Sequence, residues 1–141
     1  MPDHATRLRA AGLRVTEPRL ALLHALEETP HATVDELATA VRAERGSVST
    51  QAVYDALEAF VRADIVRRIE PAGSPARFES RVGDNHHHVV CRRCGATADV
   101  DCAVGRRPCL TPNESSGFVV DEADVTYWGT CPRCQEKERL A

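Results

Sequence analysis

Four cysteines in two Cys-x-x-Cys pairs form the strongest chemical pattern in this chain. Cys91 and Cys94 make the first pair, and Cys131 and Cys134 make the second. Four thiolates suit the closed tetrahedral coordination of a structural zinc ion, whose binding energy stabilises the fold. Because 36 residues separate the pairs, we expect a small sheet between them. Two independent redox pairs, or unpaired buried thiols, are the alternatives.

Three consecutive histidines stand a few residues before the first cysteine pair. In a strand, His86 and His88 would point to one face and His87 to the other, so two imidazoles would make half of a metal site. Carboxylates follow and precede them at Asp99 and Glu79. A mixed nitrogen and oxygen shell suits Fe(II), Mn(II), Co(II) or Zn(II), and spacing does not choose among them. The alternative for a histidine triplet is an exposed polar loop.

Two further cysteines, Cys102 and Cys109, lie outside both pairs. They are either small residues without a chemical role or a thiol pair that adds sensitivity to oxidants. Reactivity requires a stabilised thiolate, which the sequence does not decide, although Arg106 and Arg107 lie between the two thiols.

A predicted helix over residues 49–63 carries the groups suited to nucleic acid. Val53, Leu57 and Phe60 recur at helical spacing and form its expected buried face. Its first turns offer short polar side chains and Tyr54, which can reach phosphates and base edges. An ordinary capped helix with polar solvent positions is the alternative.

Three more helices and a hairpin accompany this helix. The helices are expected over 4–11, 18–28 and 33–43, the last with a capping box from Thr33 to Glu36. Two alternating runs, 65–70 and 77–80, flank a Pro- and Gly-rich turn and predict the hairpin. Helices followed by a hairpin are typical of a winged helix, a relative of helix-turn-helix.

The second half of the chain predicts a small metal-binding domain. Strand-like runs occupy 89–91, 97–100, 117–121 and 124–129, with a loop or broken helix over 104–116. The sequence therefore predicts an α+β protein with three parts: a winged-helix DNA-binding domain over 1–80, a hinge over 81–85, and a small α/β domain over 86–141.

Composition restricts the class of protein. The chain has 141 residues, of which 43% are hydrophobic, and no apolar run is long enough to span a membrane. The first ten residues lack the apolar segment of a signal peptide, so we expect a cytoplasmic protein whose cysteines bind metal or do redox chemistry. A net charge of −3 excludes a general polycation but allows a local basic surface.

Several motifs in order resemble the ferric uptake regulator family. They are GLRVTEPR (12–19), VSTQAVYDAL (48–57), RFE (77–79), HHHVVCRRCG (86–95) and YWGTCPRC (127–134). The resemblance covers nearly the whole chain, and the combined order is far more specific than any one motif. QAVYDAL, GDNHHH and DVDCAV resemble in particular the actinobacterial branch associated with catalase-peroxidase genes.

The resemblance implies a homodimer, formed through the C-terminal domain, on an AT-rich palindromic operator in double-stranded DNA. Tyr54 matches a helix tyrosine that packs against bases, and Arg14 matches a residue that reaches the minor groove. The matching phosphate or base partners are Arg19, Ser49, Thr50 and Gln51. Many relatives carry arginine where this chain has Asp55, which indicates a different operator.

The resemblance also implies two metal sites. Cys91, Cys94, Cys131 and Cys134 match the ligands of structural Zn2+. His31, Glu79, His86, His88 and Asp99 match a regulatory site for Fe2+ or Mn2+, which Zn2+ or Co2+ can replace in vitro. An ion bound to all five would fix the angle between the domains and couple metal affinity to DNA affinity.

The branch resemblance and Asp99, where many iron sensors have glutamate, favour a repressor that senses peroxide and controls oxidative-stress genes. Bound Fe(II) would reduce hydrogen peroxide, and His31 or His86 would be oxidised. An iron- or zinc-responsive uptake repressor is the alternative. An enzyme with a small-molecule substrate is disfavoured because a zinc hydrolase needs an open coordination position. A zinc-stapled interaction module that does not bind DNA is a further alternative.

Overall fold

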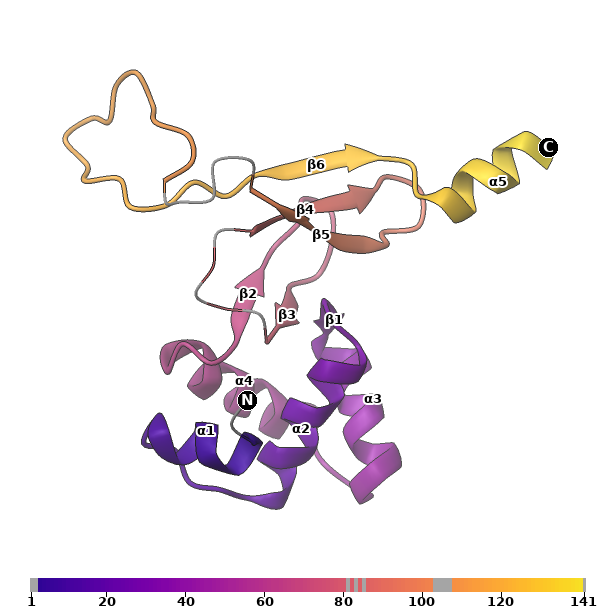
Figure 1. The fold of residues 1–141 in the computed structure, drawn as a ribbon. Coiled ribbons are helices and arrows are strands. Elements are labelled where there is room, and N and C mark those ends of the chain that lie inside the picture. Colours follow the sequence, from indigo (N-terminus) through magenta and orange to yellow (C-terminus); the bar gives the residue numbers. More distant parts are fainter. Residues whose placement is uncertain (1–2, 81, 83, 85, 103–107, 141) are drawn as a thin grey trace. The chain divides into compact units, whose positions relative to one another are not determined.

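The computed structural model describes residues 3–80, 82, 84, 86–102 and 108–140. The chain divides into two compact units, Met1–Val82 and Gly83–Ala141, whose elements are labelled in Figure 1. Three residues of the predicted hinge, 81, 83 and 85, lie outside the described part. Among the described residues, every helix is too short or too polar to cross a membrane. The mixture of helices and two small sheets confirms the predicted α+β class.

The first unit is a winged helix. Its elements are α1 (His4–Ala10), α2 (Glu17–Glu28), β1 (Ala32–Thr33), α3 (Val34–Arg45), α4 (Thr50–Arg62), β2 (Arg67–Ile69) and β3 (Arg77–Glu79). The sheet is antiparallel, with strand order β1-β3-β2. The four predicted helices and the predicted hairpin are therefore present, with ends that differ by at most two residues.

Side-chain caps determine where these helices begin. The Thr33 hydroxyl accepts a hydrogen bond from the Glu36 N–H at 3.2 Å, and the Ser49 hydroxyl accepts one from the Ala52 N–H at 3.0 Å. Each cap satisfies a backbone donor that has no partner within the helix. Ser49 therefore fixes the start of α4, the helix that carries the candidate DNA contacts.

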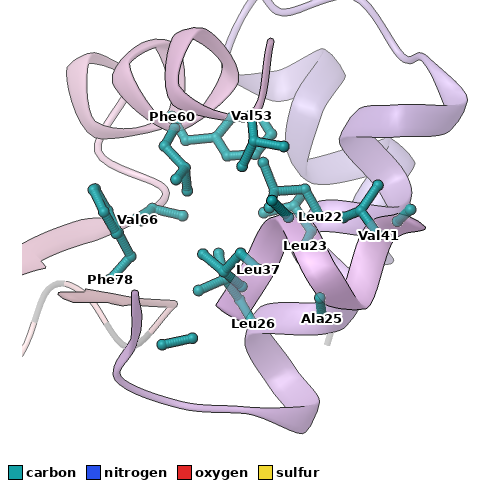
Figure 2. Packing of buried hydrophobic residues seen from close by; sticks show 14 of the residues in the cluster. Leu22, Leu23, Ala25, Leu26, Leu37, Val41, Val53, Phe60, Val66 and Phe78 are labelled. Atoms are coloured by element: carbon teal, nitrogen blue, oxygen red, sulfur yellow. The ribbon is translucent and has the colours of Figure 1, made fainter. Parts of the chain in front are cut away.

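One apolar core joins the helices to the wing (Figure 2). Leu57 and Phe60 of α4 are buried, which confirms the predicted inward face of that helix. The other large side chains of this core come from all the surrounding elements: Leu8, Leu22, Leu23, Leu26, Leu37, Val41, Val53, Val66 and Phe78. Packing against α2, α3 and the wing therefore holds α4 in one orientation.

The sequence pattern did not predict β1. Ala32 pairs with Phe78 and Thr33 pairs with Arg77, so this two-residue strand forms the edge of the sheet beside β3. Two residues are too few to show an alternating pattern, which explains the omission. The pairing matters for the site because His31 directly precedes β1 and Glu79 ends β3.

The second unit is a three-stranded sheet followed by a helix. Its elements are β4 (His86–Cys91), β5 (Thr97–Asp101), β6 (Thr126–Gly129) and α5 (Pro132–Leu140). The strand order is β5-β4-β6, with β5 antiparallel and β6 parallel to β4. The central strand begins at His86, three residues before the predicted start, so all three histidines belong to it.

One expectation for this unit was wrong, and one of its elements was not predicted. The apolar run over 117–121 is not a strand: Phe118 is 76% exposed and Val119 is 96% exposed. The helix α5 was not predicted, because its residues are mostly polar and lack a strong apolar face. It follows Cys131 directly, with Pro132 at a position where the missing N–H is tolerated.

Replacing Phe60 with alanine tests the core. The ring is fully buried, so Phe60→Ala is expected to lower the free energy of unfolding by about 3–5 kcal/mol. The measurement is chemical denaturation followed by far-ultraviolet circular dichroism, to which the four helices of the first unit contribute most. Glu58→Ala, at an exposed position of the same helix, is the control and should change stability by less than about 0.5 kcal/mol.

Candidate metal centres and DNA-contacting helix

A histidine–glutamate pair lies at the base of the wing in the first unit. His31 Nε2 is 3.1 Å from Glu79 Oε2, and both side chains are buried. His31 has a φ of 63°, an unusual value for a non-glycine residue, and its carbonyl accepts a hydrogen bond from Arg77 Nη1 at 3.1 Å. Arg77 and the β1–β3 pairing therefore hold a strained backbone that presents the imidazole to Glu79.

Two histidines of β4 meet one aspartate of β5 in the second unit. His86 Nε2 and His88 Nε2 lie 3.5 Å and 3.4 Å from the same carboxylate oxygen of Asp99. The predicted strand alternation holds, since both imidazoles lie on one face, with ring centroids 4.9 Å apart. Both rings are buried, and Asp99 pairs with His88 in the strand register.

Asp84 orients one of these imidazoles. Its Oδ1 lies 2.5 Å from His86 Nδ1, so this nitrogen donates to the carboxylate and the ring is held with Nε2 toward Asp99. A carboxylate behind a histidine is the usual support for a metal-binding imidazole, because it fixes the tautomer and the ring orientation. Asp84 was not predicted as part of the site, although an acid two residues before the three histidines is a usable signal.

The four paired cysteines gather at one end of the second sheet. The Sγ atoms of Cys91, Cys94, Cys131 and Cys134 all lie within 4.8 Å of one another. The parallel pairing of β4 with β6 places Cys91 opposite Gly129, so the two Cys-x-x-Cys turns emerge side by side. The expectation of a sheet between the pairs is confirmed, because β5 and β6 lie between them. The four sulfurs could hold one metal ion.

Hydrogen bonds make these four thiols unequal. The Cys131 N–H donates to Cys91 Sγ at 3.3 Å, and this bond, with further N–H donors in the turn, lowers the pKa of Cys91 to about 6. Hydrogen bonding to the Cys131 sulfur, together with burial, raises the pKa of Cys134 to about 12. At neutral pH the cluster therefore favours the Cys91 thiolate. Ionisation of Cys134 is disfavoured unless a cation balances the negative charge.

The remaining thiols, Cys102 and Cys109, lie near His87, the middle one of the three consecutive histidines. Ligand atoms of His87, Cys102 and Cys109 are within 4.8 Å of one another, and His87 Nε2 is 3.1 Å from Cys109 Sγ. The two thiols were candidates from the sequence, whereas no role was predicted for His87. Arg106 and Arg107, which stand between the two thiols in the sequence, lie outside the described residues.

The start of α4 exposes the polar groups expected to contact DNA. Ser49, Thr50 and Gln51 are exposed, and Tyr54 is partly exposed one turn further on. The Gln51 amide donates to the Asp55 carboxylate at 2.8 Å, one helical turn further on. These side chains share one exposed end of the helix.

An arginine that the sequence analysis overlooked supports this end of α4. Arg42 Nε donates to the Val48 carbonyl at 2.9 Å, and its Nη2 donates to the Thr50 hydroxyl at 3.0 Å. At the other predicted contact, Arg19 Nη1 donates to the carbonyl of Arg14 at 2.9 Å, and Arg14 itself is exposed. Arg19 therefore stabilises the turn that presents Arg14.

A winged helix, buried histidines beside a carboxylate in each unit and a tetrathiol cluster define a DNA-binding regulator that responds to metal ions. Comparison with known proteins specifies the family. The sequence profile of the Ferric uptake regulator family matches residues 10–126, and the chain belongs to this family. The predicted class, a regulator and not an enzyme, is confirmed, since the relatives are named as transcriptional regulators.

Close relatives come from mycobacteria. The chain is 58% identical to the transcriptional regulator FurA of Mycobacterium tuberculosis over 134 residues, which are 95% of this chain and 91% of the relative. It is 59% identical to ferric uptake regulation protein 1 of Mycolicibacterium fortuitum over 128 residues, 91% of this chain and 80% of the relative. The protein is therefore a FurA-type member of the family. The peroxide-responsive repressor PerR of Staphylococcus aureus is 30% identical over 143 residues, 97% of this chain and 93% of the relative.

Solved structures agree with the fold. The ferric uptake regulator of Vibrio cholerae superposes with a TM-score of 0.70 at 26% identity, covering 92% of this chain and 100% of that one. That regulator has DNA-binding domains. The Pseudomonas aeruginosa regulator, described with manganese, has a TM-score of 0.67 at 25% identity and covers 94% of this chain and 99% of that one.

The unequal thiols give a direct prediction for metal-free, reduced protein. Thiolate absorbance in the ultraviolet should rise with a midpoint near pH 6, because the Cys91 pKa is about 6 and a thiol ionises as pH increases through its pKa. Cys91→Ser should remove this early step, whereas Cys102→Ser should keep it. An early step that survives Cys91→Ser would contradict the assignment.

Proposed function

We propose that the protein is a metal-dependent transcriptional repressor whose regulatory ion binds five side chains. They are His31 and Glu79 of the first unit and His86, His88 and Asp99 of the second. The observation that carries the proposal is the pair of Nε2 atoms that face one oxygen of Asp99, at 3.5 Å and 3.4 Å. Buried imidazoles with a carboxylate partner, one of them oriented by Asp84, are what a regulatory metal site requires.

The donor set fits the proposed ions. Three imidazole nitrogens and two carboxylates form a mixed shell that suits Fe2+ or Mn2+, and Zn2+ or Co2+ can occupy it in vitro. Manganese in the solved Pseudomonas aeruginosa relative supports this range. The donor chemistry alone does not select the ion used in the cell, so we propose Fe2+ or Mn2+ together.

The tetrathiol cluster is the proposed structural Zn2+ site. Cys91, Cys94, Cys131 and Cys134 would fill all four tetrahedral positions, which leaves no place for a substrate. A bound ion would join the end of β4 to the start of α5. Its positive charge would also stabilise the Cys134 thiolate, which the raised pKa of Cys134 disfavours in the metal-free protein.

The proposed target is an AT-rich palindromic operator in double-stranded DNA, bound by a homodimer in the cytoplasm. Arg14, Arg19, Ser49, Thr50, Gln51 and Tyr54 are the proposed contacts, with α4 in the major groove. The second unit is the proposed dimerisation domain. Among the described residues, all the large apolar side chains that are exposed belong to this unit, except Val82. They are Leu110, Phe118, Val119, Val120, Tyr127 and Leu140.

Ligands from both units explain the proposed regulation. An ion bound to His31 and Glu79 as well as to Asp99 restricts the angle between the units, and hence the spacing of the two α4 helices in a dimer. An ion that favours the DNA-binding arrangement must also bind more tightly when DNA is present. Loss of any of these ligands therefore weakens operator binding without touching the DNA contacts.

Peroxide is the proposed signal, and oxidative-stress genes such as those for a catalase-peroxidase are the proposed targets. Fe(II) in this site would supply the reduction of hydrogen peroxide. His31 and His86 are the side chains we expect to be oxidised, and an oxidised imidazole is a poorer ligand. The 30% identity to a peroxide-responsive repressor supports this signal. The second candidate, an iron- or zinc-responsive uptake repressor, is favoured by the 59% identity to a ferric uptake regulation protein.

Operator binding by fluorescence anisotropy separates the two candidates. Protein loaded with Fe(II) or with Mn(II) is treated briefly with dilute hydrogen peroxide in the presence of operator DNA. The peroxide account expects the Fe(II) form to lose affinity by roughly 5- to 150-fold, the usual range of coupling between two sites, and the Mn(II) form to stay bound. Mass spectrometry should find the added oxygen on His31 or His86.

The controls separate this route from thiol oxidation. The double variant Cys102→Ser and Cys109→Ser should release DNA from the Fe(II) form as the native protein does. If neither metal form responds to peroxide while removal of the metal releases DNA, the protein reports metal supply and the second candidate is correct.

A further inference from the structure

The histidine on the opposite face of β4 has its own set of contacts. His87 is 3% exposed, and strand alternation separates it from His86 and His88. Its Nδ1 accepts a hydrogen bond from the Val125 N–H at 3.3 Å, and its Nε2 lies 3.1 Å from Cys109 Sγ. The Val125 carbonyl also accepts from the His88 N–H at 3.3 Å, so backbone pairing fixes the segment that holds the ring.

The hydrogen bond at Nδ1 determines what Nε2 can do. A neutral imidazole carries one proton, and a nitrogen that accepts a hydrogen bond does not hold it. The proton is therefore assigned to Nε2, which donates it toward Cys109 Sγ. A metal ion at Nε2 would need the lone pair that this proton occupies, so the contacts favour thiol chemistry over a third metal site.

A second thiol lies within reach of the first. Cys102 Sγ and Cys109 Sγ are within 4.8 Å of each other, and both residues are partly exposed. Six residues separate them in the sequence, so a bond between them closes a short loop. Neither cysteine is buried, unlike the imidazole beside them.

We propose that Cys109 is a peroxide-reactive thiol, oriented by His87, and that Cys102 resolves its oxidised form into a disulfide. An N–H donor directed at sulfur stabilises the negative charge of an attacking thiolate. The substrate class is hydrogen peroxide or a small organic hydroperoxide. Since His87 takes no part in the regulatory site, this inference goes beyond the proposed function and needs no regulatory metal.

The reaction balances without any further reagent. The Cys109 sulfur attacks one peroxide oxygen, the O–O bond breaks, and the leaving hydroxide takes up the thiol proton as water. The resulting sulfenic acid is attacked by the Cys102 sulfur, an S–S bond forms, and a second water leaves with the Cys102 proton. Two thiols lose two electrons, which the peroxide gains.

The test uses full-length protein with zinc bound and Mn(II) in place of Fe(II), so that oxidation of histidine by iron is absent. After treatment with hydrogen peroxide, free thiols are alkylated and peptides are analysed by mass spectrometry. The proposal expects a Cys102–Cys109 disulfide, with the other four cysteines recovered as alkylated thiols after the zinc is removed. In Cys102→Ser, Cys109 should stop at sulfenic acid, which a dimedone-type reagent traps.

His87→Leu, whose side chain has no N–H donor, tests the orienting role. Loss of the donor should slow oxidation of Cys109 on the order of tenfold, the effect expected for a hydrogen bond to a charged group. His24→Leu, at an exposed position of α2, is the matched control and should oxidise at the native rate. Zinc content and circular dichroism verify that each variant is folded, and His87→Val repeats the test if His87→Leu fails to fold.

Three results would overturn the proposal. The first is that Cys102 and Cys109 remain thiols under doses that oxidise other residues. The second is that peroxide attacks Cys94 or Cys131 first, and the third is that folded His87→Leu or His87→Val is oxidised at the native rate. Because Mn(II) is bound throughout, none of these results depends on whether the regulatory site senses peroxide.

Discussion

Strand β4 buries three consecutive histidines, and a buried imidazole without a polar partner is strongly unfavourable. The alternation of side chains along the strand divides them between two faces. On one face His86 and His88 meet Asp99 of β5, and on the other His87 meets the Val125 N–H and Cys109. A shift of one residue in the strand register would exchange these faces, so the pairing of β4 with its neighbours determines the chemistry on both.

Short strand pairings also position the remaining groups. The two residues of β1 pair with β3 and bring His31 to Glu79, and Arg77 binds the carbonyl of the strained His31. The parallel pairing of β4 with β6 brings the two Cys-x-x-Cys turns to one end of the second sheet. In each unit, groups that are far apart in the sequence meet because a strand pair fixes their relative positions.

The sequence predicted the elements whose signals are local. Caps and apolar periodicity located the four helices of the first unit, and the cysteine spacing indicated the tetrathiol cluster. Signals that depend on tertiary structure were missed: β1 is too short to show a period, and α5 is too polar to show an apolar face. The apolar residues Phe118 and Val119 led to the wrong prediction of a strand over 117–121, because both are exposed in a segment without regular structure. Nothing local to His87 indicates Cys109, because β5 and the segment after it separate the two residues in sequence.

The central claim is that one regulatory ion uses ligands from both units. Mn(II) binding, measured by electron paramagnetic resonance in zinc-loaded protein, tests it most directly with His31→Ala in the first unit and Asp99→Ala in the second. The account predicts that each variant loses the same single high-affinity ion, while His24→Ala and Asp121→Asn, at exposed positions, retain it. Native Mn(II) affinity in folded His31→Ala would contradict the account, because the ion would then belong to the second unit alone.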